Sequence, residues 1–213
     1  MAPSASVHPP LQARSRKTLD RISRAVEDLL ATRAFDDITV ADIVRTAGCS
    51  TGSFYARFAS KDDVLPYLYA RYDADLRQRV KSRISTVDWE RLTFRETVQL
   101  VADNTVDMYT ERRHLLRAVA LFARTQPRAI KADVRRGRES TTDLPAKFLA
   151  RFAREINHAD PMDAARLGFF MVASVAREKI LFGEAPHASS TPLSNDRLKT
   201  ELGRMLHSYL TGG

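Results

Sequence analysis

Two strings in the chain have residue types and a spacing that metal enzymes use. Glu111-x-x-His114 and Glu155-x-x-His158 share the Glu-x-x-His spacing of di-iron carboxylate bundles, which also need a Glu from each of two other helices. Both strings fall at the ends of predicted helices, whereas a buried metal site favours mid-helix positions with apolar flanks. Metal binding is therefore the minor interpretation, and the sequence predicts no metal site and no cofactor.

A third string, Gly48-Cys49-Ser50-Thr51-Gly52, matches the G-x-S-x-G turn that presents a nucleophilic serine in α/β-hydrolases. That turn follows a β-strand, but the residues before Ser50 have the pattern of a short helix. Ser50 is therefore interpreted as the N-cap of the next helix. Cys49 is interpreted as a small turn residue, with a redox role as the alternative. We expect no catalytic residue, and hence no enzyme.

The elements that position these residues are predicted to be helices throughout. Apolar residues recur at spacings of three and four, as in Leu19, Ile22 and Val26, and no strand-length alternation is present. The fold class is therefore predicted to be all-α. The predicted helices cover about 15–33, 39–46, 50–57, 60–84, 93–111, 114–125, 128–157, 161–183 and 194–211.

Several of these helices have recognisable starts. Three begin with Ser or Thr followed three residues later by an acid, as in a capping box. These pairs are Thr39 with Asp42, Ser60 with Asp63, and Thr93 with Glu96. Asp160-Pro161 offers an N-cap with proline at the first helical position. Pro66 is expected in the second turn of helix 60–84, where it would remove a hydrogen bond and kink the helix.

Composition sets the broad class of the protein. The 213 residues carry 34 Lys+Arg and 26 Asp+Glu, a net charge of +8, with a single cysteine. No apolar run is long enough to span a bilayer, so we expect a reduced, cytoplasmic protein without a membrane segment. The excess charge lies in residues 77–213, because residues 1–76 hold 10 basic and 10 acidic residues. Net charge alone therefore does not locate a nucleic-acid site.

The two short helices 39–46 and 50–57 are separated by only Ala47, Gly48 and Cys49. This spacing is typical of a helix-turn-helix motif. Phe54 and Phe58 would anchor the second helix to the core. Four residues of that helix then face outward with groups suited to base edges and phosphates: Thr51, Ser53, Tyr55 and Arg57.

The string TVADIVRTAGCSTGSFYARFASKDDVL resembles the DNA-binding signature of the TetR family of transcriptional regulators, a match that covers about residues 16–76. The resemblance implies that Thr39 and Tyr55 contact phosphates, that Thr51 and Ser53 face the major groove, and that Lys61 contacts the DNA backbone. The complete predicted DNA-binding set is Thr39, Ser50, Thr51, Gly52, Ser53, Tyr55, Arg57 and Lys61. Pro66 and the cysteine at position 49 depart from the family pattern.

The expected organisation is a flexible arm over 1–13, a three-helix DNA-binding domain over 14–76 with its motif at 39–58, and a helical domain over 77–213. The resemblance implies that this second domain binds a small molecule and dimerises. Apolar stripes on the last two helices suit a four-helix interface, with an intramolecular core as the alternative. The predicted interface residues are Leu167, Phe170, Met171, Ser174, Glu178, Leu198, Leu202, Met205, Leu206 and Tyr209.

An effector pocket is expected on helices 93–111, 114–125, 128–157 and 161–183. The candidate lining is apolar with few polar groups, which suits a hydrophobic effector, although each residue alone is better explained as core. The candidates are Val101, Thr105, Met108, Tyr109, Leu116, Val119, Phe122, Phe148, Phe152 and Phe169. The basic stretch 112–154 is interpreted as a solvated helical face, with attraction of an anionic ligand as the alternative.

These observations favour a ligand-responsive regulator that binds a palindromic operator in double-stranded DNA as a homodimer. Repression relieved by a small, largely hydrophobic effector is the favoured form, and activation is a variant that the sequence does not separate from it. The alternative is a helical-bundle enzyme or small-molecule carrier whose helix-turn-helix-like segment is incidental.

Overall fold

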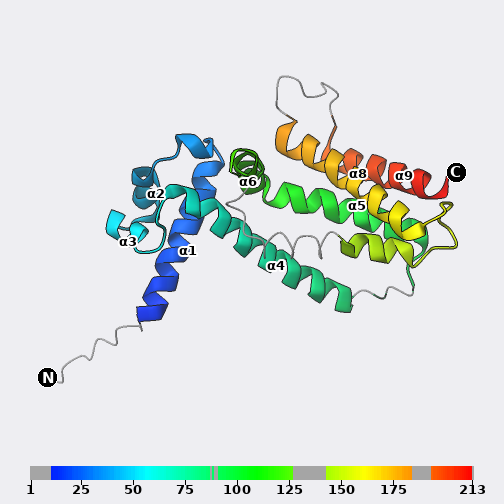
Figure 1. Ribbon diagram of the computed structural model, residues 1–213, viewed down its shortest axis with the longest axis horizontal. Helices are drawn as coiled ribbons and strands as arrows, with labels where there is room; N and C mark the ends of the chain where they lie inside the picture. The colour runs from blue at the N-terminus through cyan, green and yellow to red at the C-terminus, as the bar shows by residue number, and fades with distance from the viewer. Residues whose placement is uncertain (1–10, 87, 89–90, 127–142, 184–192, 213) are drawn as a thin grey trace. The chain divides into compact units, whose positions relative to one another are not determined.

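The computed structural model describes residues 11–86, 88, 91–126, 143–183 and 193–212. Every regular element within these ranges is a helix, which confirms the all-α prediction (Figure 1). The chain divides into two compact units, Met1–Leu68 and Tyr69–Gly213. The division falls inside helix α4 (Val64–Thr86), whereas the sequence predicts the domain boundary after residue 76 of the same helix.

The first unit holds a cluster of short helices around a closed apolar core. Its elements are α1 (Leu11–Leu30), η1 (Phe35–Asp37), α2 (Val40–Ala47), α3 (Thr51–Tyr55), η2 (Lys61–Asp63) and the first residues of α4. The core combines Ile22 and Val26 of α1 with Ile43 of α2 and Phe54 of α3, and all four are fully buried. Because α1 begins at Leu11, the last three residues of the predicted arm are helical, and residues 1–10 lie outside the described part.

The predicted caps at Thr39, Thr93 and Asp160 are confirmed. Thr39, Thr93 and Asp160 each cap their helix, with side-chain oxygens that accept main-chain N–H groups of the first turn at 2.9–3.3 Å. Ser60 and Asp63 form the third capping box, at the start of η2. Each cap accepts main-chain N–H groups that would otherwise have no partner within the helix. The caps therefore fix the residues at which these helices begin.

The prediction for Pro66 was wrong. Residues 61–63 form the short 3-10 helix η2, so the α-helix begins only at Val64 and Pro66 is its third residue. An N–H in the first turn has no acceptor four residues earlier, and proline is tolerated there. Pro66 therefore costs α4 no intrahelical hydrogen bond.

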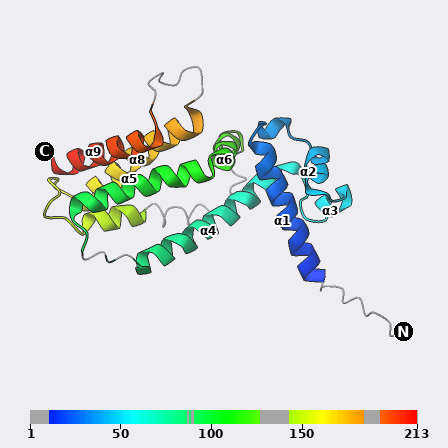
Figure 2. The ribbon, with the colours of Figure 1, turned by 180° about the vertical axis from the view of Figure 1, so that it is seen from behind.

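The second unit is built on a bundle of three long helices, α5 (Phe94–Glu111), α8 (Pro161–Phe182) and α9 (Asn195–Thr211). They lie side by side in Figures 1 and 2 and contact one another in every pairing. Helix α6 (Arg113–Thr125) follows α5 and packs on α8. Gly168 allows α8 and α9 to approach closely, because a Cβ at this position would lie 2.6 Å from Leu206 Cδ1.

The predicted helix over 128–157 is only partly observed. Residues 127–142 lie outside the described part, residues 143–150 are helical, and residues 151–155 form turns. The prediction was wrong for the last seven residues. The N–H of Phe152 bonds the oxygen of Leu149, three residues earlier, and the N–H of Asn157 bonds Leu210 O of α9 at 2.8 Å. The helix therefore ends at residue 150, and the segment that follows it is hydrogen-bonded to the end of α9.

Candidate nucleic-acid interface

The turn between α2 and α3 depends on one left-handed glycine. Gly48 has φ 58° and ψ 42°, and it ends α2 with its N–H bonded to Arg45 O. Among the described residues it is the only one with positive φ, a conformation that side chains with a Cβ disfavour. Arg21 of α1 supports the turn from outside, since its Nε donates to Ala47 O at 2.7 Å and its Nη2 donates to Gly48 O.

Helix α3 is short, and two contacts hold it in place. Ser50 caps it, with Oγ accepting the N–H of Ser53 at 3.1 Å, which confirms the N-cap interpretation. On the opposite face, Phe54 is fully buried and its ring centroid lies 5.4 Å from that of Phe58. The outward face is left to Thr51 and Gly52, which are exposed, and to the residue that follows Phe54.

Tyr55 is the largest side chain on this outward face. It is 54% exposed, and its ring meets the edge of Phe54 at a centroid distance of 5.4 Å. The contact fixes the ring, while the hydroxyl remains available to a partner outside the chain. A tyrosine held in this way can donate to a phosphate oxygen without first being ordered.

A charged network fixes the start of α2. The hydroxyl and N–H of Thr39 both donate to Asp42 Oδ2, at 2.8 and 3.1 Å. Arg33 and Arg45 form ion pairs with the same carboxylate, at 3.1 and 2.5 Å. The hydrogen bonds from Thr39, assisted by Arg33, hold the pKa of Asp42 well below its usual value. The predicted phosphate contact Thr39 is exposed and already serves as a helix cap.

Two predicted DNA contacts carry positive charges that the protein itself uses. Arg57 is half-buried, and its Nη1 donates to Ser53 O at 2.6 Å. Lys61 Nζ donates to the main-chain oxygens of Phe35 and Asp36 at 3.0 and 3.2 Å, and lies 4.7 Å from the centre of the Phe35 ring. Ser53 is also half-buried, with its hydroxyl 3.0 Å from that of Ser50.

Sequence reasoning missed the two arginines that organise this unit, Arg21 and Arg33. Arg21 reaches residues 26 and 27 positions away, and Arg33 pairs with Asp42 across the loop between α1 and α2. The sequence gives little indication of these contacts, because Arg21 is one of several charges on an amphipathic helix and Arg33 is a single charge in a loop.

A capped short helix that is anchored by Phe54 and follows a glycine turn defines a helix-turn-helix DNA-binding protein. The sequence profile described as "Bacterial regulatory proteins, tetR family" matches residues 22–68, which include all of α2 and α3. This part of the chain is therefore similar to the DNA-binding region of TetR-family transcriptional regulators, and the match supports a regulator of that family.

A curated relative also matches this region of the chain. The chain is 46% identical over 57 residues to the uncharacterized HTH-type transcriptional regulator YwcC of Bacillus subtilis (strain 168). That match covers 27% of this chain and 26% of YwcC, so it spans about a quarter of the curated relative. It joins the family profile in pointing to a regulator rather than an enzyme.

Solved structures show that the whole fold recurs. A TetR-family transcriptional regulator from Agrobacterium tumefaciens superposes with a TM-score of 0.66 at 15% identity, covering 93% of this chain and 100% of that one. The regulator FadR from Bacillus subtilis, solved in complex with stearoyl-CoA, superposes with a TM-score of 0.61 at 16% identity, covering 93% and 98%. At these identities the likeness concerns the fold alone.

The two metal-like strings are engaged in other contacts. Both carboxylate oxygens of Glu111 lie 2.8 Å from Arg79 Nη1, and His158 Nε2 lies 2.7 Å from Tyr209 O. Glu155 is exposed. Across the described ranges, no group of three or more His, Cys, Asp or Glu residues is arranged to hold a metal ion. No helix in those ranges has the length and apolar character needed to cross a membrane.

The predicted interface residues fall into two groups. Leu198, Leu202 and Leu206 are buried within the chain, where α9 packs on α5 and α8, so the structure places them in the intramolecular core that was the alternative. The others are exposed or half-buried: Leu167, Phe170, Met171, Ser174, Glu178, Met205 and Tyr209. Among these seven, Phe170 is 64% exposed.

The predicted pocket residues lie in the interior of the second unit. Thr105, Tyr109, Leu116, Val119 and Phe122 are buried. The remaining five are half-buried: Val101, Met108, Phe148, Phe152 and Phe169. The hydroxyl of Thr105 donates to Val101 O at 2.7 Å, so it already has a partner in its own helix.

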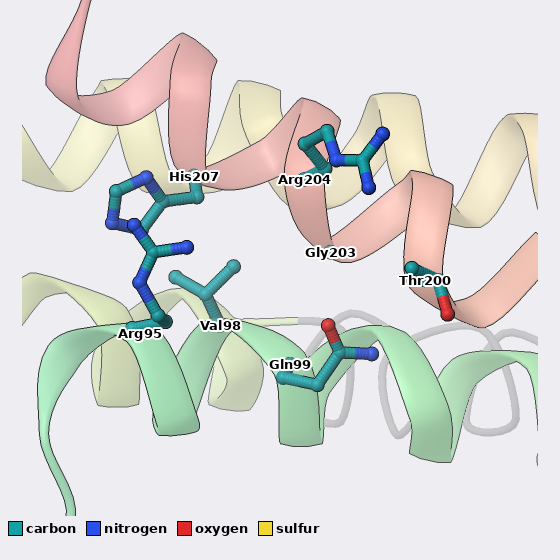
Figure 3. Close-up of a pocket in the computed structure, with 7 residues that line it drawn as sticks. All are labelled: Arg95, Val98, Gln99, Thr200, Gly203, Arg204 and His207. Atoms are coloured by element: carbon teal, nitrogen blue, oxygen red, sulfur yellow. The ribbon is translucent and has the colours of Figure 1, made fainter.

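A different, more polar cavity of about 170 Å³ lies between α5 and α9 (Figure 3). It is lined by Arg95, Val98, Gln99, Thr200, Gly203, Arg204 and His207, none of which belongs to the predicted pocket. Figure 3 shows the Arg95 side chain rising from α5 beside the His207 ring, while Arg204 points away from Arg95. Gln99 fills the space beside Gly203 and donates to Lys199 O at 3.2 Å.

Proposed function

We propose that this TetR-family regulator is a homodimeric repressor that binds a palindromic operator and is released by a small, largely hydrophobic effector. The observation that carries the proposal is the outward face of α3. Its Thr51, Gly52 and Tyr55 are exposed, while Ser50 and Phe54 hold the helix in position. A preordered helix of this kind enters a major groove without an ordering cost. Such a regulator acts in the cytoplasm, where the chromosome lies.

Dimerisation is supported by apolar side chains that the chain leaves uncovered on α8 and α9. Leu167, Phe170, Val175 and Met205 are 47%, 64%, 44% and 36% exposed. Isolated exposed apolar residues are common on protein surfaces, but several on two adjacent helices suit a helical interface. A two-fold axis there would place two copies of α3 on half-sites about 34–36 Å apart.

The effector is proposed to bind within the second unit. FadR, which has the same fold, was solved with stearoyl-CoA, a ligand with a long apolar chain. The corresponding unit of this chain is rich in buried apolar and aromatic side chains, including Leu116, Val119 and Phe122. We assign the effector to this apolar interior. Its binding would favour a dimer conformation in which the recognition helices no longer fit both half-sites.

The test is selection of bound DNA from a random pool, followed by affinity measurement over a range of salt concentrations. We expect a palindromic site whose affinity falls steeply with salt. Thr51→Ala should weaken binding to this site, and Thr200→Ala on α9 serves as the matched control. The proposal fails if no DNA is bound at low salt, or if the two threonine variants bind the site equally well.

A further inference from the structure

The amino-terminal half of α1 carries an excess of positive charge. Between Arg14 and Arg24 the sequence has five basic residues and one acidic residue. The first turn of α1 has no acidic residue, and its last turn has no basic residue. A helix is stabilised by the opposite order, with acids near its start and bases near its end. The charge order of α1 is therefore not explained by the stability of the helix.

Three of these basic residues form a row along one side of α1. Lys17, Arg21 and Arg24 are spaced by four and three residues, which places them on one face. Arg21 fixes where that face lies, because it donates to Ala47 O and Gly48 O in the turn that leads into α3. Lys17 and Arg24, one turn to either side, are exposed. The row ends at Asp28, one turn beyond Arg24.

Four basic residues in and around the motif donate to groups of the protein itself. Main-chain oxygens accept from three of them: Arg33, Arg57 and Lys61. A fourth, Arg45, donates to the Asp42 carboxylate at 2.5 Å. Moving these charges onto DNA would exchange existing hydrogen bonds for new ones, which reduces the net gain.

We infer that Lys17 and Arg24 bind the phosphate backbone of DNA beside the half-site that α3 contacts, an inference that rests on the proposed operator binding. Arg21 donates to the turn that leads directly into α3. A DNA duplex bound against α3 would therefore pass close to the row formed by Lys17, Arg21 and Arg24. Figures 1 and 2 show the amino-terminal turns of α1 running on beyond α2 and α3. Contacts of this kind add affinity and salt dependence without reading sequence.

The experiment compares the full-length wild type with the double variant Lys17→Ala/Arg24→Ala. Affinity for the selected operator is measured between 50 and 300 mM salt, about the range in which counterion release dominates. We expect the slope of log affinity against log salt to become shallower by about two, one for each lost phosphate contact. The preference for operator over random DNA should stay unchanged. The matched control is Arg117→Ala/Arg151→Ala, which removes two exposed charges from the second unit.

A charge reversal, Lys17→Glu/Arg24→Glu, should weaken binding further, while the melting temperature stays within about 2 °C of wild type, because both side chains are exposed. A wild-type salt slope in the alanine variant, with operator binding intact, would overturn this inference and leave the proposed function standing. An equal loss of slope in the control variant would also overturn it. Absence of operator binding by the wild type would instead reject the proposed function, and the inference with it.

Discussion

Arg21 Nε donates to the main-chain oxygen of Ala47 at 2.7 Å, which joins α1 to the last residue of α2 across 26 residues of sequence. The same guanidinium also donates to Gly48 O. Removing it would leave both carbonyls of the turn without this donor. We expect Arg21→Ala to lower the free energy of unfolding by about 1.5–3 kcal/mol, as for hydrogen bonds that involve a charged group. Urea denaturation measures the change, and Arg117→Ala should change stability by less than about 0.5 kcal/mol.

The two glycines of the motif should respond oppositely to alanine. At Gly48 the φ of 58° and an Arg21 Nη2 atom 3.0 Å from the new Cβ both disfavour a side chain. Gly48→Ala should therefore destabilise the protein by about 1 kcal/mol or more. At Gly52 the nearest atom to a new Cβ is Ser50 Oγ at 3.9 Å, so Gly52→Ala should be neutral or stabilising by up to about 1 kcal/mol. Equal melting temperatures for the two variants would contradict this account.

The Asp42 carboxylate should make the stability of the first unit depend on pH in the acidic range. Its hydrogen bonds from Thr39 lower its pKa in the folded protein below the usual value for an aspartate. A lowered folded pKa contributes stability above the unfolded pKa, and that stability is lost as pH falls below it. Asp42→Asn should therefore flatten the loss of stability between about pH 5 and pH 3. Thermal melts over this range test it, with Asp28→Asn, an exposed acid of α1, expected to follow the wild type.

The exposed face of α8 should control the oligomeric state. Phe170 is 64% exposed, and a glutamate there would place a charge in the proposed interface. We expect Phe170→Glu to shift the protein to monomers in analytical ultracentrifugation and to weaken operator binding by at least tenfold, because a monomer engages only one half-site. Leu121→Glu changes an apolar residue that is 45% exposed on α6. This control should remain dimeric, and a dimeric Phe170→Glu protein would rule out the assignment.

Tyr72 has a buried hydroxyl that is not satisfied. Its oxygen has no hydrogen-bond partner among the described residues, and burial raises the pKa of its phenol above the usual value of 10.0. A buried hydroxyl without a partner costs stability, so Tyr72→Phe should leave the protein unchanged or stabilise it by up to about 1 kcal/mol. Chemical denaturation measures this, with the exposed Tyr55→Phe as reference. A clear destabilisation would show that the hydroxyl is bonded in solution.

Local signals made the first unit predictable. Caps at Thr39 and Ser50, a glycine turn and buried phenylalanines act over a few residues, so the sequence pattern shows them directly. The long-range contacts could not be predicted in this way. Lys61 lies over the Phe35 ring because the two segments fold together, and Pro66 is harmless because η2 delays the start of α4.

In the second unit, the sequence predicts which helix faces are apolar but does not predict what covers them. The periodicity of α9 predicts a buried face correctly, but it does not say whether that face meets the same chain or a second copy. Leu198 and Leu206 are covered by α5 and α8, while Met205 on the same helix stays 36% exposed. Which neighbour covers an apolar stripe depends on the packing of the whole unit rather than on the pattern of one helix.

Helix α3 has five residues, too few to form alone in water, so its shape is supplied by Ser50 and by the buried Phe54 rather than by its outward side chains. The exposed Thr51 therefore contributes little to the stability of the fold. After gene duplication, a copy of this protein could acquire a new operator through a change at Thr51, the position expected to face the major groove, while keeping its stability. The motif separates the evolution of target choice from the survival of the fold.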